Sequence, residues 1–169
     1  MTIREAAPQD AEAIARVHVD TWRDAYGGIV PDSILGALSY ESRKRDWEKR
    51  IGVAETTVLV ADVDGEVAGF GACGPTRFPL DGYAGEIYAL YVDPQSQGTG
   101  VGEKLFAALR ERLRAAGLER CTLWVFEDNV DGCSFYEKLG GRRLDQRSTE
   151  MAGQAVIELA YGFGPHEAE

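Results

Sequence analysis

The feature that most constrains the fold is a glycine-rich segment, Gln97-Gly98-Thr99-Gly100-Val101-Gly102. The apolar run over residues 86 to 92 before it predicts a buried β-strand, which ends at Asp93-Pro94. Residues 100 to 116 after it place leucines along one face of a predicted helix. Alternate glycines let backbone N–H groups turn toward one anion, which the positive end of a helix attracts. The segment therefore predicts an anion site at a strand-to-helix connection.

Two common phosphate-binding patterns do not match this segment. No Gly-Lys-Ser/Thr follows, which excludes the P-loop, and Glu103 stands where the dinucleotide-binding pattern has its third glycine. A literal G-x-G-x-x-G occurs at Gly69, Gly71 and Gly74, but Pro75 follows it and no helix does. We therefore interpret that second match as part of a strand.

The order of elements predicts an α/β (α+β) domain with a mixed sheet, because it is not the strict alternation of a doubly wound fold. One domain is expected over residues 1–162, since 169 residues suit a single core, with a loose tail over 163–169. The expected strands cover residues 2–6, 57–63, 66–73, 86–92, 120–126, 142–149 and 154–161, the expected helices cover about 10–26, 40–51, 100–116 and 129–139, and residues 74–85 are expected to form a loop.

Charge narrows the classes of partner. The formal net charge of −10 argues against nucleic acid and against an anionic membrane surface. An acidic protein attracts cationic substrates such as amines, although acidity also serves solubility. The three cysteines form no Cys-x-x-Cys pair and the N-terminus has no signal-peptide pattern, so a cytoplasmic protein with reduced thiols is expected. No His/Cys/Asp cluster has the spacing of a metal site.

Three motifs in order give the glycine segment a more specific meaning. Gln97-x-x-Gly100-x-Gly102 resembles the acetyl-CoA signature Q/R-x-x-G-x-G/A of the GCN5-related N-acetyltransferase (GNAT) superfamily. The preceding Leu90-Tyr91-Val92-Asp93-Pro94 is similar to the same family. So is the later segment with asparagine at 129 and Phe-Tyr-Glu-Lys-Leu-Gly over 135–140, and together these motifs span about residues 86 to 141. The sequence departs from the family at Gly141, where an aromatic residue is usual, and at the acidic Glu103.

The resemblance implies a fold and an activity. The fold is a mixed, mostly antiparallel sheet of six to seven strands, with helices on both faces and a splay between the fourth and fifth strands. The activity is direct transfer of an acetyl group from acetyl-CoA, a co-substrate, to a primary amine of a small molecule, protein or peptide. A non-catalytic acyl-CoA sensor on the same fold and a nucleotide-binding protein of another class are the alternatives. Dimers are common among similar proteins, so a homodimer is compatible with the resemblance.

The resemblance also implies the residues that bind the cofactor. In the family the pantetheine arm bonds to the backbone of the first splayed strand, and here the Val92 N–H matches a donor that polarises the thioester carbonyl. Asn129 is expected to cap its helix and to reach a pantetheine carbonyl. The implied cofactor-binding residues are Leu90, Tyr91, Val92, Gln97, Gly98, Thr99, Gly100, Val101, Gly102, Glu103, Asn129 and Tyr136.

Acetyl transfer to an amine needs a proton acceptor and a proton donor. Glu86 matches a family position that often serves as base through water, and Glu127 and Asp128 are the reserve candidates. Some members instead have a glutamate at the position of Trp124, so that variant is excluded. Tyr136 matches the general acid of the family, which protonates the leaving thiolate.

The acceptor side is less defined by sequence. In the family the first helices and the segment at 74–85 form the acceptor wall, so Trp22 and Tyr26 are candidates to line it, with a plain core role as the alternative. His18 lies on the same helical stripe and is expected to be structural.

Overall fold

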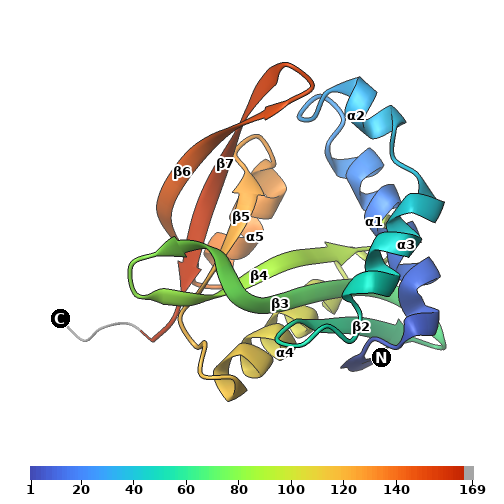
Figure 1. Ribbon diagram of the computed structural model, residues 1–169, viewed down its shortest axis with the longest axis horizontal. Helices are drawn as coiled ribbons and strands as arrows, with labels where there is room; N and C mark the ends of the chain where they lie inside the picture. The colour runs from blue at the N-terminus through green and yellow to red at the C-terminus, as the bar shows by residue number, and fades with distance from the viewer. Residues whose placement is uncertain (166–169) are drawn as a thin grey trace.

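The computed structural model describes residues 1–165 and contains one seven-stranded sheet in the order β1-β2-β3-β4-β5-β7-β6 (Figure 1). Most of the expected C-terminal tail, including His166, lies outside the described residues. The strands are β1 (Thr2–Glu5), β2 (Thr57–Val63), β3 (Glu66–Leu80), β4 (Tyr83–Val92), β5 (Cys121–Phe126), β6 (Arg142–Met151) and β7 (Gln154–Phe163).

The sheet is mixed, and its one parallel contact divides it. Strands β1 to β4 pair antiparallel, as do β5, β7 and β6. Strands β4 and β5 run parallel and pair only at Gly85 with Cys121 and at Glu86 with Thr122. Beyond these two pairs the strands separate, which confirms the expected splay between the fourth and fifth strands.

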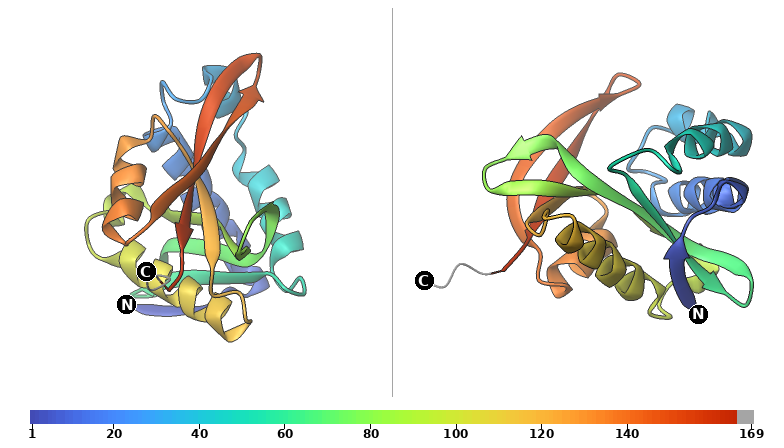
Figure 2. Two further views of the ribbon diagram at one scale, coloured as in Figure 1. Left: turned by 90° about the vertical axis from the view of Figure 1, so that its left-hand side faces the viewer. Right: turned by 60° about the horizontal axis from the view of Figure 1, so that its bottom comes forward.

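Helices cover both faces of the sheet, as expected (Figure 2). On one face α1 (Ala11–Ala25) and α3 (Tyr40–Arg50) pack on β2 and β3. The opposite face carries α4 (Val101–Ala115) and α5 (Val130–Lys138). Leucines 105, 109 and 113 of α4 are buried in the core on this face, and α5 packs against the same core. The short α2 (Asp32–Gly36) does not appear among the expected helices. No helix of residues 1–165 is long and apolar enough to cross a membrane.

Residues 74–85 form a β-hairpin, so the expected loop was wrong. Strand β3 continues to Leu80, and β4 pairs antiparallel with it from Tyr83 onward. Pairing with β2 ends at Cys73, so this part of β3 is an edge where Pro75 removes no ladder hydrogen bond. The Tyr88 hydroxyl donates to the Pro75 carbonyl and anchors the hairpin to β4.

The C-terminal strands are longer than expected. Strand β6 reaches Met151 and joins β7 through Ala152 and Gly153, whose φ angles of 48° and 81° suit a tight hairpin turn. Strand β7 includes Phe163, which is 4% exposed and packs against Phe106. The ordered strand therefore extends one residue into the expected tail.

Candidate active site

The glycine segment forms an open cradle of backbone donors. Gly98 and Gly100 have φ angles of 74° and 85°, in the left-handed region that favours glycine. Gly100 caps the start of α4. Within residues 1–165, none of the five backbone N–H groups from Gly98 to Gly102 donates a hydrogen bond. Unpaired backbone N–H groups at the start of a helix are typical phosphate-binding groups.

Neighbouring groups hold the cradle in place. Gln97 Nε2 donates to the Val92 carbonyl over 3.2 Å, which ties the segment to the end of β4. The Thr99 hydroxyl donates to the Ser96 carbonyl over 2.6 Å. A Cβ on Gly102 would lie 3.2 Å from the Phe135 ring, so glycine permits close contact between α4 and α5. Val101 is buried in the core beneath α4.

Glu103 faces the cradle. Its side chain is exposed, and its Oε2 atom lies 4.0 Å from the place that a Cβ on Gly100 would occupy. The carboxylate stabilises the first turn of α4, because it complements the positive helix end. It also places a negative charge beside the predicted phosphate site, where it would repel the phosphate. The sequence already indicates this departure from the family at Glu103.

Strand β4 offers free backbone next to the cradle. Leu90, Tyr91 and Val92 pair with β3, but on the side of the splay they have no strand neighbour. The side chains of Leu90 and Val92 pack against the core under α4. The side chain of Tyr91 points to the opposite face, where its ring stacks on His18 with centroids 5.3 Å apart. The predicted backbone role and the packing roles are therefore compatible.

Helix α5 brings Asn129 and Tyr136 to the splay. Asn129 Oδ1 accepts the Gly132 N–H over 3.1 Å, so the predicted cap is present. Tyr136 packs among aromatic rings of the core, and after burial an electrostatic interaction with Tyr91 contributes to its raised pKa. Burial raises the pKa of the Tyr136 hydroxyl, which keeps the phenol protonated at neutral pH.

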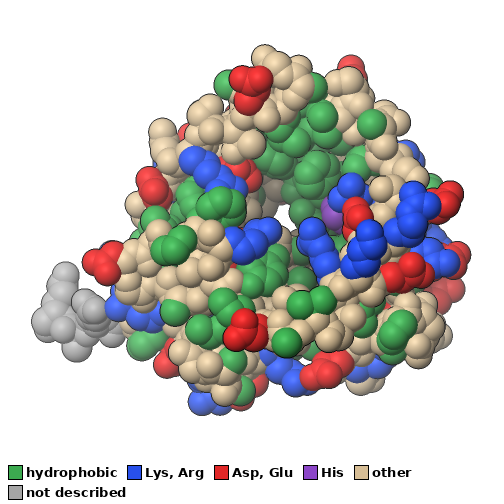
Figure 3. Space-filling model, viewed as in Figure 1, with side chains coloured by type: hydrophobic (Ala, Val, Ile, Leu, Met, Phe, Trp, Pro, Cys, Tyr) green, Lys and Arg blue, Asp and Glu red, His purple; other side chains and the backbone are tan. Residues whose placement is uncertain are grey.

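Strand alternation builds a second face, on the side of α1. Successive residues of a strand point to opposite faces, so Glu86 of β4, Trp124 of β5, Glu158 of β7 and Arg147 of β6 share this side. Figure 3 shows a hollow on this face, lined largely by hydrophobic side chains with Lys and Arg groups at its rim. The hollow lies between the two halves of the splayed sheet and α1.

Aromatic residues at the C-terminal end of α1 pack against the end of β5. Tyr26 packs edge-on against Phe126, with centroids 4.9 Å apart, and Trp22 lies against Tyr26 at 5.0 Å. Burial raises the pKa of Tyr26 well above its usual value, and interactions with Tyr91 and Tyr136 add to the rise. The two α1 candidates therefore belong to a packed cluster that reaches the residues of the splay.

His18 has the structural role expected of it. Its Nδ1 accepts the indole N–H of Trp47 over 3.0 Å. Burial, together with the charges of Arg43 and Arg50, lowers the pKa of His18 to about 4. The imidazole is therefore neutral at neutral pH and serves as a hydrogen-bond acceptor.

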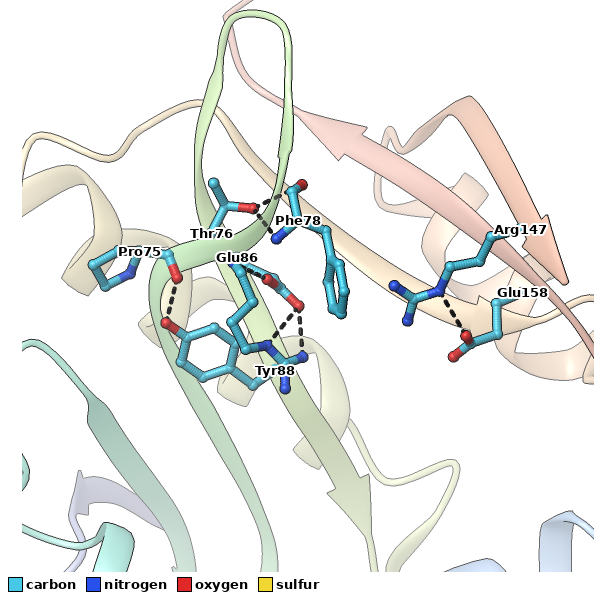
Figure 4. Close-up of polar contacts among 8 residues, drawn as sticks. Pro75, Thr76, Phe78, Glu86, Tyr88, Arg147 and Glu158 are labelled. Carbon is cyan, nitrogen blue, oxygen red and sulfur yellow. Dashed lines mark hydrogen bonds and ion pairs between the residues drawn. The ribbon is translucent and has the colours of Figure 1, made fainter. Parts of the chain in front are cut away.

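Glu86 is buried, whereas the sequence suggests an exposed carboxylate at a strand end. It is 1% exposed, and its Oε2 accepts the backbone N–H of Arg77 over 2.8 Å. The Arg77 guanidinium donates to Oε1 over 2.6 and 3.2 Å (Figure 4). Glu86 therefore fixes the β3–β4 hairpin through Arg77. The reserve acids Glu127 and Asp128 are both exposed after β5.

A second ion pair lies on the other side of Phe78 (Figure 4) and does not follow from motif reasoning. Arg147 Nε donates to Glu158 Oε2 over 2.8 Å, and the Arg147 guanidinium carbon lies 4.1 Å from the ring centroids of both Phe78 and Trp124. These four residues come from four strands. The period-two alternation of β6 and β7 is the signal that assigns Arg147 and Glu158 to this face.

Comparisons with known proteins agree with this geometry. Residues 14–141 match the model of the acetyltransferase (GNAT) family. The uncharacterized N-acetyltransferase YuaI of Bacillus subtilis (strain 168) is 34% identical over 163 residues, covering 96% of this chain and 92% of YuaI.

Two solved structures share the fold. The PaiA N-acetyltransferase of Thermoplasma acidophilum, in complex with coenzyme A, has a TM-score of 0.75 at 23% identity and covers 93% of this chain and 96% of its own. The putative acetyltransferase YncA of Salmonella typhimurium, with acetyl-CoA, has a TM-score of 0.74 at 22% identity and covers 100% and 96%.

The splayed sheet, the glycine cradle and these matches define an acyltransferase. The chain belongs to the GNAT family, and its activity is that of an acetyl-CoA-dependent acyltransferase.

Proposed function

We propose that the protein transfers the acetyl group of acetyl-CoA to a primary amine. The observation that carries the proposal is the row of free N–H groups from Gly98 to Gly102, beside the unpaired backbone of β4. A phosphate site and an extended strand edge, set end to end, suit the pyrophosphate and the amide-rich arm of this cofactor. The hollow on the α1 side then receives the amine.

The residues present fit the cofactor. The amides of Gly98 to Gly102 would bind the pyrophosphate, with Gln97 and Thr99 holding the loop in shape. The strand edge at Leu90 and the Val92 N–H would bind the pantetheine arm, since the Val92 carbonyl already accepts from Gln97 Nε2 and the Thr21 hydroxyl. The Asn129 amide nitrogen would add a donor, because only its oxygen is used by the cap. Acetyl-CoA supplies the acetyl group activated as a thioester.

The transfer needs two proton movements. The amide C–N bond forms as the thioester C–S bond breaks, one proton leaves the amine nitrogen, and one reaches the sulfur. Tyr136 is the proposed donor to sulfur, because its raised pKa keeps the hydroxyl proton in place until a thiolate forms. The products are an N-acetylated amine and CoA.

Glu86 is the proposed acceptor of the amine proton. Among residues 1–165 its Oε2 accepts only the Arg77 backbone N–H, which leaves a lone pair of this oxygen for a water molecule that bridges to the amine. The ion pair with Arg77 holds the carboxylate in a fixed position on the acceptor face. Trp22 and Tyr26 are the proposed apolar wall against which the acceptor lies.

Substitution of Tyr136 by Phe tests the enzyme against the acyl-CoA sensor. We expect Tyr136→Phe to bind acetyl-CoA with unchanged affinity in calorimetry and to lose turnover by roughly a hundredfold or more, the usual range for a general acid. Tyr161→Phe is the matched control, because its hydroxyl donates to Glu137 and the same core surrounds it. Equal turnover of Tyr136→Phe and the wild type would remove Tyr136 from the mechanism.

A further inference from the structure

The Arg147 guanidinium is held in one orientation with part of its hydrogen-bonding edge free. Its carbon sits 4.1 Å from the ring centroids of both Phe78 and Trp124, in the corner between two rings set at 76°. Only Nε has a partner, Glu158 Oε2. The two terminal nitrogens have no hydrogen-bond partner within the described part of the chain.

Such a group is a preorganised receptor for an oxyanion. A guanidinium presents its N–H groups in a rigid fork that matches a carboxylate, and packing on aromatic rings removes the freedom that binding would otherwise cost. The side chain is 30% exposed, so a ligand in the hollow can reach it. Figure 4 shows Arg147 reaching from β6 toward Phe78 and the β3–β4 hairpin.

Glu158 supplies a complementary free acceptor. Both Arg147 Nε and the Thr149 hydroxyl donate to its Oε2, each over 2.8 Å. Its Oε1 has no partner among residues 1–165, and the carboxylate is 15% exposed. An ammonium and a carboxylate carried by one small molecule would therefore find a free acceptor and a free donor side by side.

The charge of the hollow favours a ligand that carries both groups. Glu86 balances Arg77, and Glu158 balances Arg147, so the two ion pairs add no net charge. A polyamine would bring several positive charges to these pairs, whose carboxylates are already balanced by arginines. A zwitterion leaves the balance intact. The local charges thus point away from the cationic acceptor that the net charge of −10 suggests.

We propose that the acceptor is a small amine that carries a carboxylate, the chemical class of the amino acids, and that Arg147 binds this carboxylate. The assignment rests on the proposed acetyl transfer to an amine. Arg77 is not the receptor, because its Nε, one terminal nitrogen and its backbone N–H are all engaged by Glu86.

The test compares amino acids with the amines that remain when their carboxylate is removed. For the wild type, steady-state CoA release with each matched pair should give a kcat/KM for the amino acid of the preferred pair roughly tenfold or more above that of its amine, as expected for a charged hydrogen bond. Arg147→Gln should abolish this ratio through a higher KM for the amino acid, with the value for the plain amine nearly unchanged. Arg142→Gln, an exposed arginine on the same strand, is the control and should keep the ratio.

A binding readout separates this inference from the proposed function. In the presence of CoA, titration calorimetry should detect the preferred amino acid with the wild type and Arg142→Gln and not with folded Arg147→Gln. Equal use of both members of every pair, preference for the plain amines, or acetylation of neither set by a protein that binds acetyl-CoA would overturn the carboxylate assignment. Absence of acetyl-CoA binding itself would instead overturn the proposed function.

Discussion

At the scale of single residues, the three glycines of the cradle are required for two different reasons. Gly98 and Gly100 adopt positive φ angles that side chains with a Cβ rarely tolerate. Gly102 has an ordinary helical backbone, but a Cβ there would press on the Phe135 ring at 3.2 Å. The first two shape the anion site, and the third lets α4 and α5 approach each other.

Substitution of Gly100 tests the cradle directly. We expect Gly100→Val to weaken acetyl-CoA binding by roughly tenfold or more, because a β-branched residue at positive φ shifts the loop amides. Gly117→Val is the matched control, since Gly117 also has a positive φ of 76° but ends α4 far along the chain from the cradle. Calorimetry on both folded variants decides, and equal loss of affinity in the two would refute the loop assignment.

Glu103 provides a prediction of the opposite sign. Removal of its charge in Glu103→Gln should tighten acetyl-CoA binding by about two- to fivefold at low ionic strength, and the gain should shrink as salt screens it. Glu111→Gln removes the same charge two turns later on α4 and should leave the affinity unchanged. A weaker or salt-independent effect of Glu103→Gln would mean that the carboxylate turns away from the bound phosphate.

His18 makes the stability of the fold depend on pH. Its pKa falls from 6.5 to about 4 in the folded state, so the unfolded chain binds more protons between these values and stability is lost as pH falls from 6.5 toward 4. The loss attributable to His18 is about 3 kcal/mol as an upper value. Urea unfolding of His18→Gln, which keeps an acceptor for Trp47, should show a flatter pH dependence in this window. Curves that stay parallel to the wild type would exclude His18 as the cause.

At the scale of elements, local patterning predicts most of the fold. The stripe of α1, the leucines of α4 and the glycine that ends each helix locate those helices to within one or two residues. The β3–β4 hairpin is the exception. Its prolines and glycines indicate a loop, whereas the contacts that order it, from Glu86 to Arg77 and from Tyr88 to Pro75, are formed only in the folded sheet.

The candidate site divides in the same way. The cofactor side lies on contiguous motifs, so its residues follow from spacing. The acceptor side joins Phe78, Trp124, Arg147 and Glu158, which lie on four strands and meet through long-range pairing. No local signal brings such residues together. The family resemblance indicates Trp22, Tyr26 and Glu86 on that side, and it does not extend to Arg147 or Glu158.

The Glu86–Arg77 pair links the hairpin to the mechanism. Glu86→Gln should lower kcat/KM by roughly a hundredfold, because the amine loses its proton acceptor. It should also lower stability by about 1–3 kcal/mol, less than for a fully buried pair, since Arg77 is half exposed. Glu127→Gln, at an exposed acid that follows the opposite end of β5, should change neither. Retention of full turnover by Glu86→Gln would assign the proton to another acceptor.

At the scale of the whole molecule, the main feature is the gap between β4 and β5. The sheet is joined across β4 and β5 by two residue pairs only, and the gap beyond them opens between the proposed cofactor side under α4 and α5 and the proposed acceptor side under α1. Tyr26 follows α1, Tyr91 lies on β4 and Tyr136 on α5, and after burial the charges of Tyr91 and Tyr136 further raise the pKa of Tyr26. We expect the acetyl group to be transferred where these two proposed sides meet.

The most direct test of the central claim follows both substrates in one sample. Titration of the full chain with acetyl-CoA should give saturable binding, and addition of amino acids and plain amines should yield an acetylated amine together with an equal amount of free CoA. Mass spectrometry and thiol release measure the two products. Failure to bind acetyl-CoA, with binding of ATP or NAD in its place and no acetylated amine, would contradict the account.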